Sequence, residues 1–404
     1  MPTLIKDLIS TKSVICHFQP VVSVKKRAVV GLEALARGVD GPTNRYLPEL
    51  MFSLAEDARV AEELDDLCRV SALTAFAALP NRTSMALFLN IDATRLSRGQ
   101  FSAATVRKSV EEAGLQPQDV VLEFSDLDFA RSPGLRALID ACQTFGFCVA
   151  LDDLDCGPAC MRRLADMKPN VVKVDDHVVL GLSNDPVRRA LFQALTSLAR
   201  RQGALTVAEG VENEEDGLLA LELGADLLQG FHFGRPAAAE RLALPAAKAA
   251  VERSAMRVKA MVAGRTQVRQ RENERHLLLL EKIRKALHGV EAALFAQTLD
   301  QFVDPVASLE CLYVMDSRGA QCTPTVVWKY QRESQRSRLF IPAAAGADHS
   351  LKDYYLGLTL GPQDPYISDP YVSLATGNLC RTLTTRFDDS AGRDYILCMD
   401  TRST

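Results

Sequence analysis

Residues 147–153 read F-C-V-A-L-D-D, an apolar run that ends in two adjacent aspartates. A short continuous apolar run is typical of a strand that is buried on both faces, as in a parallel sheet. Two carboxylates at the end of such a strand disfavour each other's charged form. A divalent cation would relieve this repulsion, which makes Asp152 and Asp153 a candidate metal site. The alternative is that one aspartate caps the next helix while the other faces solvent.

Strands and helices alternate on both sides of this stretch. Strands predicted at residues 14–22 and 28–37 are joined by a short turn, which indicates an antiparallel hairpin. Further strands are predicted at 85–91, 120–124, 171–174, 205–208 and 226–231, with helices at 48–79, 101–113, 134–145 and 186–202. This alternation is typical of a βα barrel or of a doubly wound sheet.

Polar residues at the ends of the predicted strands favour the barrel. They are Glu33, Asn90, Glu123, Asp152, Asp153, Lys173, Glu209 and Gln229. Several of them follow one another at the roughly thirty residues that one unit of an eightfold barrel occupies. We therefore expect an α/β fold, a modified TIM (β/α)8 barrel whose first two strands are antiparallel. Because strand carboxyl ends converge on one face of a barrel, these side chains should meet in one site.

The chemistry of this set indicates metal-assisted phosphoryl transfer. Carboxylates together with the amide oxygen of Asn90 suit magnesium, manganese or calcium better than zinc. Lys173 and Arg37 supply positive charge where an anionic substrate would lie. Cations beside an oxygen-liganded metal pair are what phosphoryl transfer uses.

An ordered series of motifs resembles the EAL domain, the cyclic di-GMP phosphodiesterase family, over residues 5–240. The series is G-L-E-A-L-A-R at 31–37, F-L-N-I-D at 88–92, V-L-E-F-S-D at 121–126, L-D-D at 151–153, K-P-N-V-V-K-V-D at 168–175, A-E-G-V-E at 208–212 and Q-G-F-H-F-G-R-P at 229–236. A lone E-A-L carries almost no information, whereas the ordered series is specific.

The resemblance implies a role for each matching residue. Glu33, Asn90, Glu123 and Asp152 would hold one Mg²⁺ or Mn²⁺, and Asp153 would help to hold a second. Lys173 would orient the attacking water, and Glu209 would act as general base or as a ligand of the second metal. The substrate-binding set would be Gln19, Leu35, Arg37, Asp175, Gln229 and Pro236. The implied reaction opens cyclic di-GMP to the linear dinucleotide pGpG, with calcium inhibitory.

One loop departs from the family pattern. After the paired aspartates the family usually reads F-G-T-G-Y-S-S-L, whereas residues 154–161 read L-D-C-G-P-A-C-M. The family also usually has glutamate at the position of Asp126, which supports this loop from the neighbouring strand. Loss of such supporting groups lowers metal affinity or activity about 10–100-fold. We therefore expect weak or regulated hydrolysis; the alternatives are a silent receptor that binds cyclic di-GMP, and a scaffold that binds neither metal nor nucleotide.

Three regions are expected: the barrel at 1–245, a helical linker at 246–300 and an α+β domain at 301–404. The linker carries a basic run, interpreted as a solvated face, and an apolar stripe that could pair two subunits in a homodimer. The last region loosely resembles PAS-like or Cache-like domains, which implies sensing of a small ligand or dimerisation. Candidate pocket residues there are Trp328, Tyr354, Tyr355, Tyr366, Tyr371 and Arg381.

Composition sets the remaining limits. Of the 404 residues, 47% are hydrophobic and 24% are charged, which is ordinary for a globular protein. The formal net charge of -4 gives no basic field for a nucleic-acid polymer. The sequence shows no signal peptide and no bilayer-spanning run, so a cytoplasmic protein without a membrane partner is expected.

Overall fold

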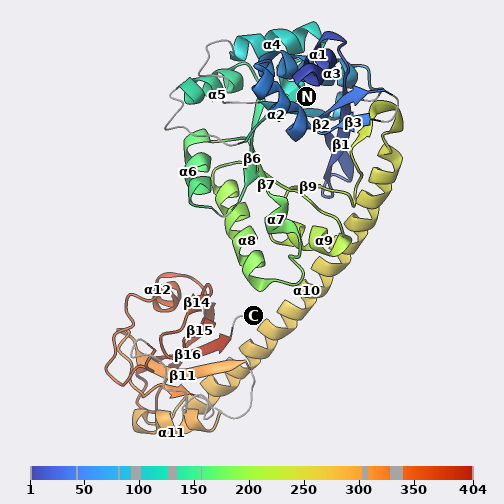
Figure 1. The fold of residues 1–404 in the computed structure, drawn as a ribbon. Coiled ribbons are helices and arrows are strands. Elements are labelled where there is room, and N and C mark those ends of the chain that lie inside the picture. Colours follow the sequence, from blue (N-terminus) through green and yellow to red (C-terminus); the bar gives the residue numbers. More distant parts are fainter. Residues whose placement is uncertain are drawn as a thin grey trace. The chain divides into compact units, whose positions relative to one another are not determined.

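The computed structural model describes residues 2–41, 44–80, 82–91, 102–125, 134–155, 157–302, 308–327 and 340–402. The chain forms two compact units, Met1–Met261 and Val262–Thr404 (Figure 1). The division lies inside the helix α10 (Leu244–Leu287), and therefore inside the linker expected at 246–300. No described helix is long and apolar enough to cross a membrane.

Eight strands of the first unit close into a barrel. In spatial order they are β1 (Val14–Ser23), β2 (Ala28–Asp40), β4 (Ala86–Ile91), β5 (Val120–Phe124), β6 (Cys148–Leu154), β7 (Val171–Val174), β8 (Leu205–Ala208) and β9 (Leu227–Gln229). Strand β1 pairs antiparallel with both β2 and β9, which closes the barrel, and the other neighbours are parallel. The modified TIM barrel with an antiparallel first pair is confirmed. Two short strands, β3 (Asn44–Tyr46) and β10 (Ala237–Ala238), extend the sheet at β2 and β1.

Helices cover the outside of this barrel (Figure 1). They are α1 (Pro2–Ser10), α2 (Pro48–Ala58), α3 (Ala61–Ala77), α4 (Ala103–Glu112), α5 (Gly134–Thr144), α6 (Pro158–Met167), α7 (Asp176–Val179), α8 (Pro186–Arg201) and α9 (Glu214–Glu222). Local sequence explains where several of them begin. Asp185 caps α8 by accepting hydrogen bonds from the backbone N–H of Val187 and Arg188, and Pro186 occupies the first turn, where its missing N–H costs nothing.

The strands alternate between two apolar layers. Outward residues such as Leu122 and Leu151 join the large core beneath the helices. Inward residues form a smaller core inside the barrel: Val21, Phe88, Val121, Ala150, Val171 and Val207. Because side chains two residues apart share a face of a strand, this inner layer determines which residues point into the barrel mouth.

The second unit is built on an antiparallel sheet in the order β12-β11-β16-β15-β13, with β14 also paired to β15. Its elements are α11 (Phe295–Asp300), β11 (Leu309–Asp316), β12 (Val326–Val327), α12 (Asp353–Leu360), β13 (Tyr366–Ile367), β14 (Tyr371–Val372), β15 (Leu379–Asp388) and β16 (Asp394–Arg402). The α+β character agrees with expectation. The resemblance to PAS-like or Cache-like domains stays a prediction. Trp328 lies outside the described residues.

Candidate active site

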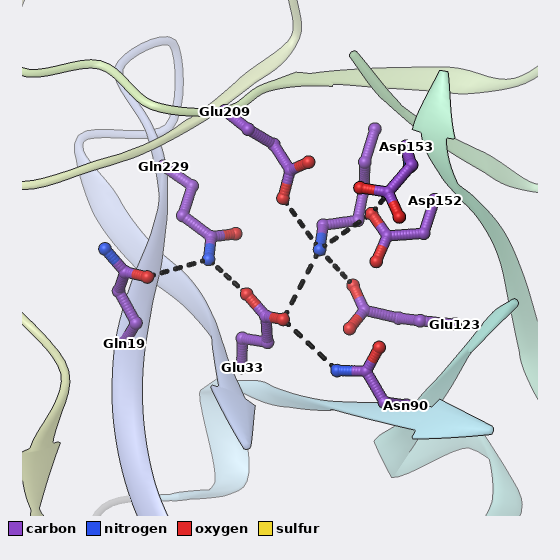
Figure 2. A network of polar contacts seen from close by, with 9 residues as sticks. Gln19, Glu33, Asn90, Glu123, Asp152, Asp153, Glu209 and Gln229 are labelled. Atoms are coloured by element: carbon purple, nitrogen blue, oxygen red, sulfur yellow. Dashed lines mark hydrogen bonds and ion pairs between the residues drawn. The ribbon is translucent and has the colours of Figure 1, made fainter. Parts of the chain in front are cut away.

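The candidate site lies directly above the inner core at the carboxyl ends of the parallel strands. Six of the site residues follow an inward residue by two positions, so both side chains of each pair point into the barrel. The pairs are Phe88 with Asn90, Val121 with Glu123, Ala150 with Asp152, Val171 with Lys173, Val207 with Glu209 and Leu227 with Gln229. Figure 2 shows the carboxylates and amides of this set pointing toward a common centre. The expectation that these residues meet at one mouth therefore agrees with their placement.

Lys173 occupies that centre and is 1% exposed. Its Nζ lies 2.8 Å from Glu123 Oε1 and 2.8 Å from Glu209 Oε1. Asp152 Oδ1 lies at 3.1 Å and Glu33 Oε1 at 3.5 Å from the same nitrogen. One ammonium cannot neutralise four carboxylates, so the cluster retains an excess of negative charge that further cations would relieve.

A chain of amides fixes Glu33 from the other side. Gln229 Nε2 donates to Glu33 Oε2 and also to Gln19 Oε1, at 3.2 Å in the second case. Asn90 Nδ2 donates to Glu33 Oε1 at 3.3 Å. Gln19 is held in turn by donating from Nε2 to the carbonyl oxygen of Gly234 at 3.2 Å. Glu33 is thus oriented by neutral donors on two sides, as expected for a side chain that must present its oxygens in a fixed direction.

Burial changes the acid–base properties of this cluster. Burial raises the pKa of the Glu123 carboxyl well above its usual range, although attraction to the Lys173 ammonium opposes the shift. The pKa of Glu209 is raised well above its usual range for the same reason. Burial by itself would lower the pKa of Lys173, but attraction to Glu123, Glu209 and the other carboxylates outweighs it and keeps that pKa well above normal. Perturbed groups of this kind are concentrated at functional sites.

The residues present fit a divalent metal. Oxygens of Glu33, Glu123 and Asp152 lie within 4.8 Å of one another, and so do oxygens of Asp152, Asp153 and Glu209. Glu123 Oε2 is buried and has no hydrogen-bond partner among the described residues. A buried oxygen without a partner is costly, and a cation would satisfy it. The all-oxygen donor set suits magnesium, manganese or calcium.

The loop after Asp153 begins with an unusual backbone. Asp153 has φ 50°, a left-handed conformation that is uncommon for a residue with a side chain. Its backbone N–H donates to Asp152 Oδ1 at 3.1 Å, which ties the two aspartates together. Further along, Asp155 Oδ1 accepts from the N–H of Gly157 at 2.9 Å. Asp126, predicted to support this loop, lies outside the described residues.

Two cavities adjoin the cluster. The first, of about 390 Å³, is lined by Gln19, Glu33, Leu35, Asp153, Asp175, Asp176, Glu209, Gly210, Glu212, Gln229, Gly230 and Phe231. The second, of about 320 Å³, is lined on one side by Glu33, Leu35 and Asn90 and on the other by residues of α2 and α3, including Phe52, Asp65 and Arg69. Glu33 and Leu35 line both, so the two cavities meet at the E-A-L segment.

Two predicted substrate contacts are less central. Arg37 is half-buried and donates to the carbonyl oxygen of Ala36 at 2.7 Å. Neither Arg37 nor Pro236 is among the residues that line the two cavities. Sequence reasoning missed Asp65 and Arg69, a buried pair at i, i+4 on α3 with Arg69 Nη1 donating to Asp65 at 3.0 Å. The only signal was a D-x-x-x-R spacing in a helix, which is common on exposed helix surfaces.

Comparison with known proteins identifies the family of the chain. The EAL domain family matches residues 4–236, more than half of the chain, so the chain belongs to that family. The bifunctional diguanylate cyclase/cyclic di-GMP phosphodiesterase MucR of Pseudomonas aeruginosa is 27% identical over 255 residues, covering 59% of this chain and 35% of MucR. The probable cyclic di-GMP phosphodiesterase PdeN of Escherichia coli is 25% identical over 223 residues, covering 54% of this chain and 42% of PdeN. The chain spans less than half the length of either relative.

One solved structure matches along the whole chain. It is the YkuI protein of Bacillus subtilis, which has an EAL domain and was crystallised in complex with substrate c-di-GMP and calcium. The TM-score is 0.78 at 20% identity, and the match covers 99% of each chain. At this identity the likeness establishes a shared fold, and it extends through the second unit.

Proposed function

We propose that this protein hydrolyses cyclic di-GMP to linear pGpG in a reaction that requires Mg²⁺ or Mn²⁺. The observation that carries the proposal is the convergence of Glu33, Glu123, Asp152 and Glu209 on Lys173 at the mouth of an EAL barrel. The acidic side chains that line the adjacent cavity explain why the reaction would require metal. A dianionic ligand would be repelled from this surface unless cations lay between them.

Two metal positions follow from the donor set. Glu33, Asn90, Glu123 and Asp152 would hold one ion, and Asp153 with Glu209 would help to hold a second. Bound there, the ions would offset the charge of the phosphate and lower the pKa of a coordinated water.

The protein's own groups then position the reaction. Lys173 Nζ would donate a hydrogen bond to the attacking water, and Glu209 would accept its proton. The water oxygen bonds to phosphorus, the bond from phosphorus to the ribose 3′ oxygen breaks, and the proton ends on that oxygen. Gln229 keeps Glu33 aligned while this happens. The second cavity, with Leu35 and Phe52 on its wall, is of a size and character suited to one guanine base.

We infer weak or regulated turnover from the loop at 154–161. Asp155 stands where the family usually has glycine, and its carboxylate holds the N–H of Gly157. Pro158 fixes its own backbone angle and has no donor. A loop restrained in this way would limit how far Asp153 can move during turnover. The second candidate function, a silent receptor for cyclic di-GMP, is favoured by the same loop.

The remaining partner proposals concern assembly. The apolar stripe predicted at residues 277–294 lies largely in the core of the second unit, where Leu280, Ile283 and Leu287 are buried, so it is not available to pair subunits. We propose a homodimer formed through the barrel and α10, in which the exposed apolar residues Met256, Val262 and Val268 would be covered by a second copy. We also propose a regulatory role for the second unit.

The experiment is a product assay on the full chain. Purified protein is incubated with cyclic di-GMP and Mn²⁺, and linear dinucleotide is measured by chromatography over hours, with Glu123→Gln as the inactive control. Product that appears with wild type, disappears with chelator and is absent from Glu123→Gln supports hydrolysis. Tight nucleotide binding without product would instead identify a receptor, and absence of both would reject the two functions together.

A further inference from the structure

The sheet of the second unit has two unlike faces. One face carries Leu312 and Leu397 and packs against α11 and the end of α10 in an apolar core. The opposite face, which packs against α12, carries Cys311, Tyr313 and Cys398. Burial of the apolar side chains on the first face stabilises the second unit. The second face is aromatic and polar, and it contains a buried acid.

That acid is Asp400 on β16, which is 3% exposed. It lies opposite Thr382 of β15 and Cys311 of β11 in the sheet register. Thr382 Oγ1 donates to Asp400 Oδ1 at 2.8 Å, and Cys311 Sγ donates to Oδ2 at 3.2 Å. The hydroxyl of Tyr371 lies 3.4 Å from Oδ2 and 2.6 Å from Thr382 Oγ1, so its one hydrogen is shared between these two oxygens. The hydrogen-bond partners of Asp400 in the described part of the chain are therefore neutral donors.

No lysine, arginine or histidine of the described chain forms an ion pair with Asp400. Arg402, two residues along the same strand, donates from Nε to Glu310 Oε1 at 2.8 Å. Asn378 Nδ2 also donates to both oxygens of Glu310, so Glu310 is compensated while Asp400 is not. Burying an ionised carboxylate without a cation is costly unless the group gains a proton.

The other groups that face Asp400 come from every strand and helix around it. They are Glu310, Cys311 and Tyr313 of β11, Tyr371 of β14, Cys380 of β15, Cys398 of β16 and Tyr354 of α12. The thiols and phenols are held neutral, because burial raises the pKa of each of them. The rings of Tyr354 and Tyr371 lie 6.0 Å apart and those of Tyr313 and Tyr354 lie 6.4 Å apart, so the tyrosines pack against one another.

We propose that Asp400 is a proton-binding site through which the second unit responds to pH. A proton needs no cavity, and it neutralises Asp400, the one buried acid without a cation among the described residues of this face. Burial raises the pKa of Asp400 to about 6, although hydrogen bonds from Thr382, Cys311 and Tyr371 oppose the shift. The carboxyl therefore changes charge close to neutral pH.

A hydrogen-bond chain connects this proton to the edge of the sheet. When Thr382 gives its one hydroxyl hydrogen to Asp400, the 2.6 Å contact between Tyr371 and Thr382 requires Tyr371 to be the donor. A proton on Asp400 Oδ2 is a new donor, so Tyr371 must accept a hydrogen bond there instead of donating one, while Thr382 can still donate to Oδ1. Tyr371 belongs to β14, which is held by only two register pairs, Tyr371–Cys380 and Val372–Leu379. The attachment of β14 is thus the feature that protonation alters.

The first test compares Asp400→Asn with wild type in the full chain. Asp388→Asn is the matched control, because Asp388 is exposed on the same sheet. Hydrogen–deuterium exchange of peptides from β15 and β16 gives local opening constants at a series of pH values. The folded pKa exceeds the unfolded value, so wild type is stabilised at low pH and loses that stabilisation as pH rises to about 6. The opening constant of wild type relative to Asp400→Asn should rise on the order of 100-fold between about pH 4 and 7.

In the same experiment Asp388→Asn should follow wild type at every pH. Exchange of the β14 peptide in wild type should change over the same interval. A constant ratio between wild type and Asp400→Asn would overturn the proposal.

A second measurement does not depend on how well Asp400→Asn folds. Glu123→Gln/Glu209→Gln protein lacks two other buried acids whose pKa is raised. Its infrared spectra should show a protonated carboxylic-acid band that disappears as pH rises, with a midpoint at about 6. Tyr371→Phe removes a donor to the ionised form and should move that midpoint to higher pH. A midpoint near that of a solvated aspartate, or one that Tyr371→Phe leaves unchanged, would contradict the proposal.

Discussion

Lys173 Nζ lies 2.8 Å from Glu123 Oε1, and both side chains are buried. The lysine that we propose to orient the attacking water therefore also stabilises the acids around it. Lys173→Met should therefore lower the free energy of unfolding by about 3–5 kcal/mol when no divalent metal is present. Urea unfolding monitored by circular dichroism measures the change.

The control for this substitution is Lys108→Met. Lys108 lies 3.7 Å from Glu112 on an exposed helix surface, and such pairs contribute roughly 0–1 kcal/mol. Adding Mn²⁺ should restore part of the unfolding free energy that Lys173→Met loses, because the bound ion would neutralise the Glu123 carboxylate in place of the ammonium. Equal stability of Lys173→Met and wild type without metal would show that the carboxylates do not depend on the ammonium.

Gln229 should act as a positioning residue. It donates hydrogen bonds to Glu33, a proposed metal ligand, and to Gln19, a predicted substrate contact. Gln229→Leu should weaken Mn²⁺ binding about 10–100-fold while leaving thermal stability nearly unchanged. Isothermal titration gives the affinity, and wild-type affinity in this variant would remove Gln229 from the site.

Backbone conformation next to Glu209 should be intolerant of a side chain. Gly210 has φ 63°, and an added Cβ would overlap the Cβ of Asp176. Gly210→Ala should reduce turnover strongly, because relief of that overlap displaces Glu209. Gly203 has φ 80° with no atom near its missing Cβ, so Gly203→Ala tests the conformational cost alone, about 1–2 kcal/mol. Comparable turnover in the two variants would show that Gly210 matters only for stability.

Asp216 should make the first unit sensitive to acid. Burial alone would raise the pKa of its carboxyl, but hydrogen bonds from Ser183, Asn213 and the N–H of Gly181 lower it below the usual value. A lowered folded pKa means that the stabilisation is complete above about pH 4 and is lost as pH falls further. Asp216→Ala should destabilise by about 1–3 kcal/mol at neutral pH, and by less at about pH 3. Chemical denaturation at several pH values checks this, and a difference independent of pH would contradict it.

The barrel and the convergence of its acids could be predicted because one rule determines both. Residues such as Val121 and Glu123 are two positions apart, so an inward apolar residue is followed by a polar residue at the mouth. Sequence order alone then places Glu123, Asp152 and Lys173 on neighbouring strands. The antiparallel entry of β1 followed from the short turn before β2.

Other features depended on side-chain packing that no local pattern encodes. The pairing of Asp65 with Arg69 resembles many exposed helix pairs, and only the position of α3 against the barrel buries it. The orientation of the Arg37 side chain depends on the hydrogen bond that it donates to the carbonyl oxygen of Ala36. In the second unit, a strand as short as β13, with two residues, leaves too little periodicity to be recognised.

We propose that the acids around Lys173 hold a divalent cation against cyclic di-GMP. Electron paramagnetic resonance of free Mn²⁺, titrated with the full chain, detects this binding. Wild type should bind Mn²⁺, cyclic di-GMP should tighten the binding, and Asp152→Asn should abolish it. Free Mn²⁺ that stays unbound in the presence of both wild type and cyclic di-GMP would reject the proposed metal site.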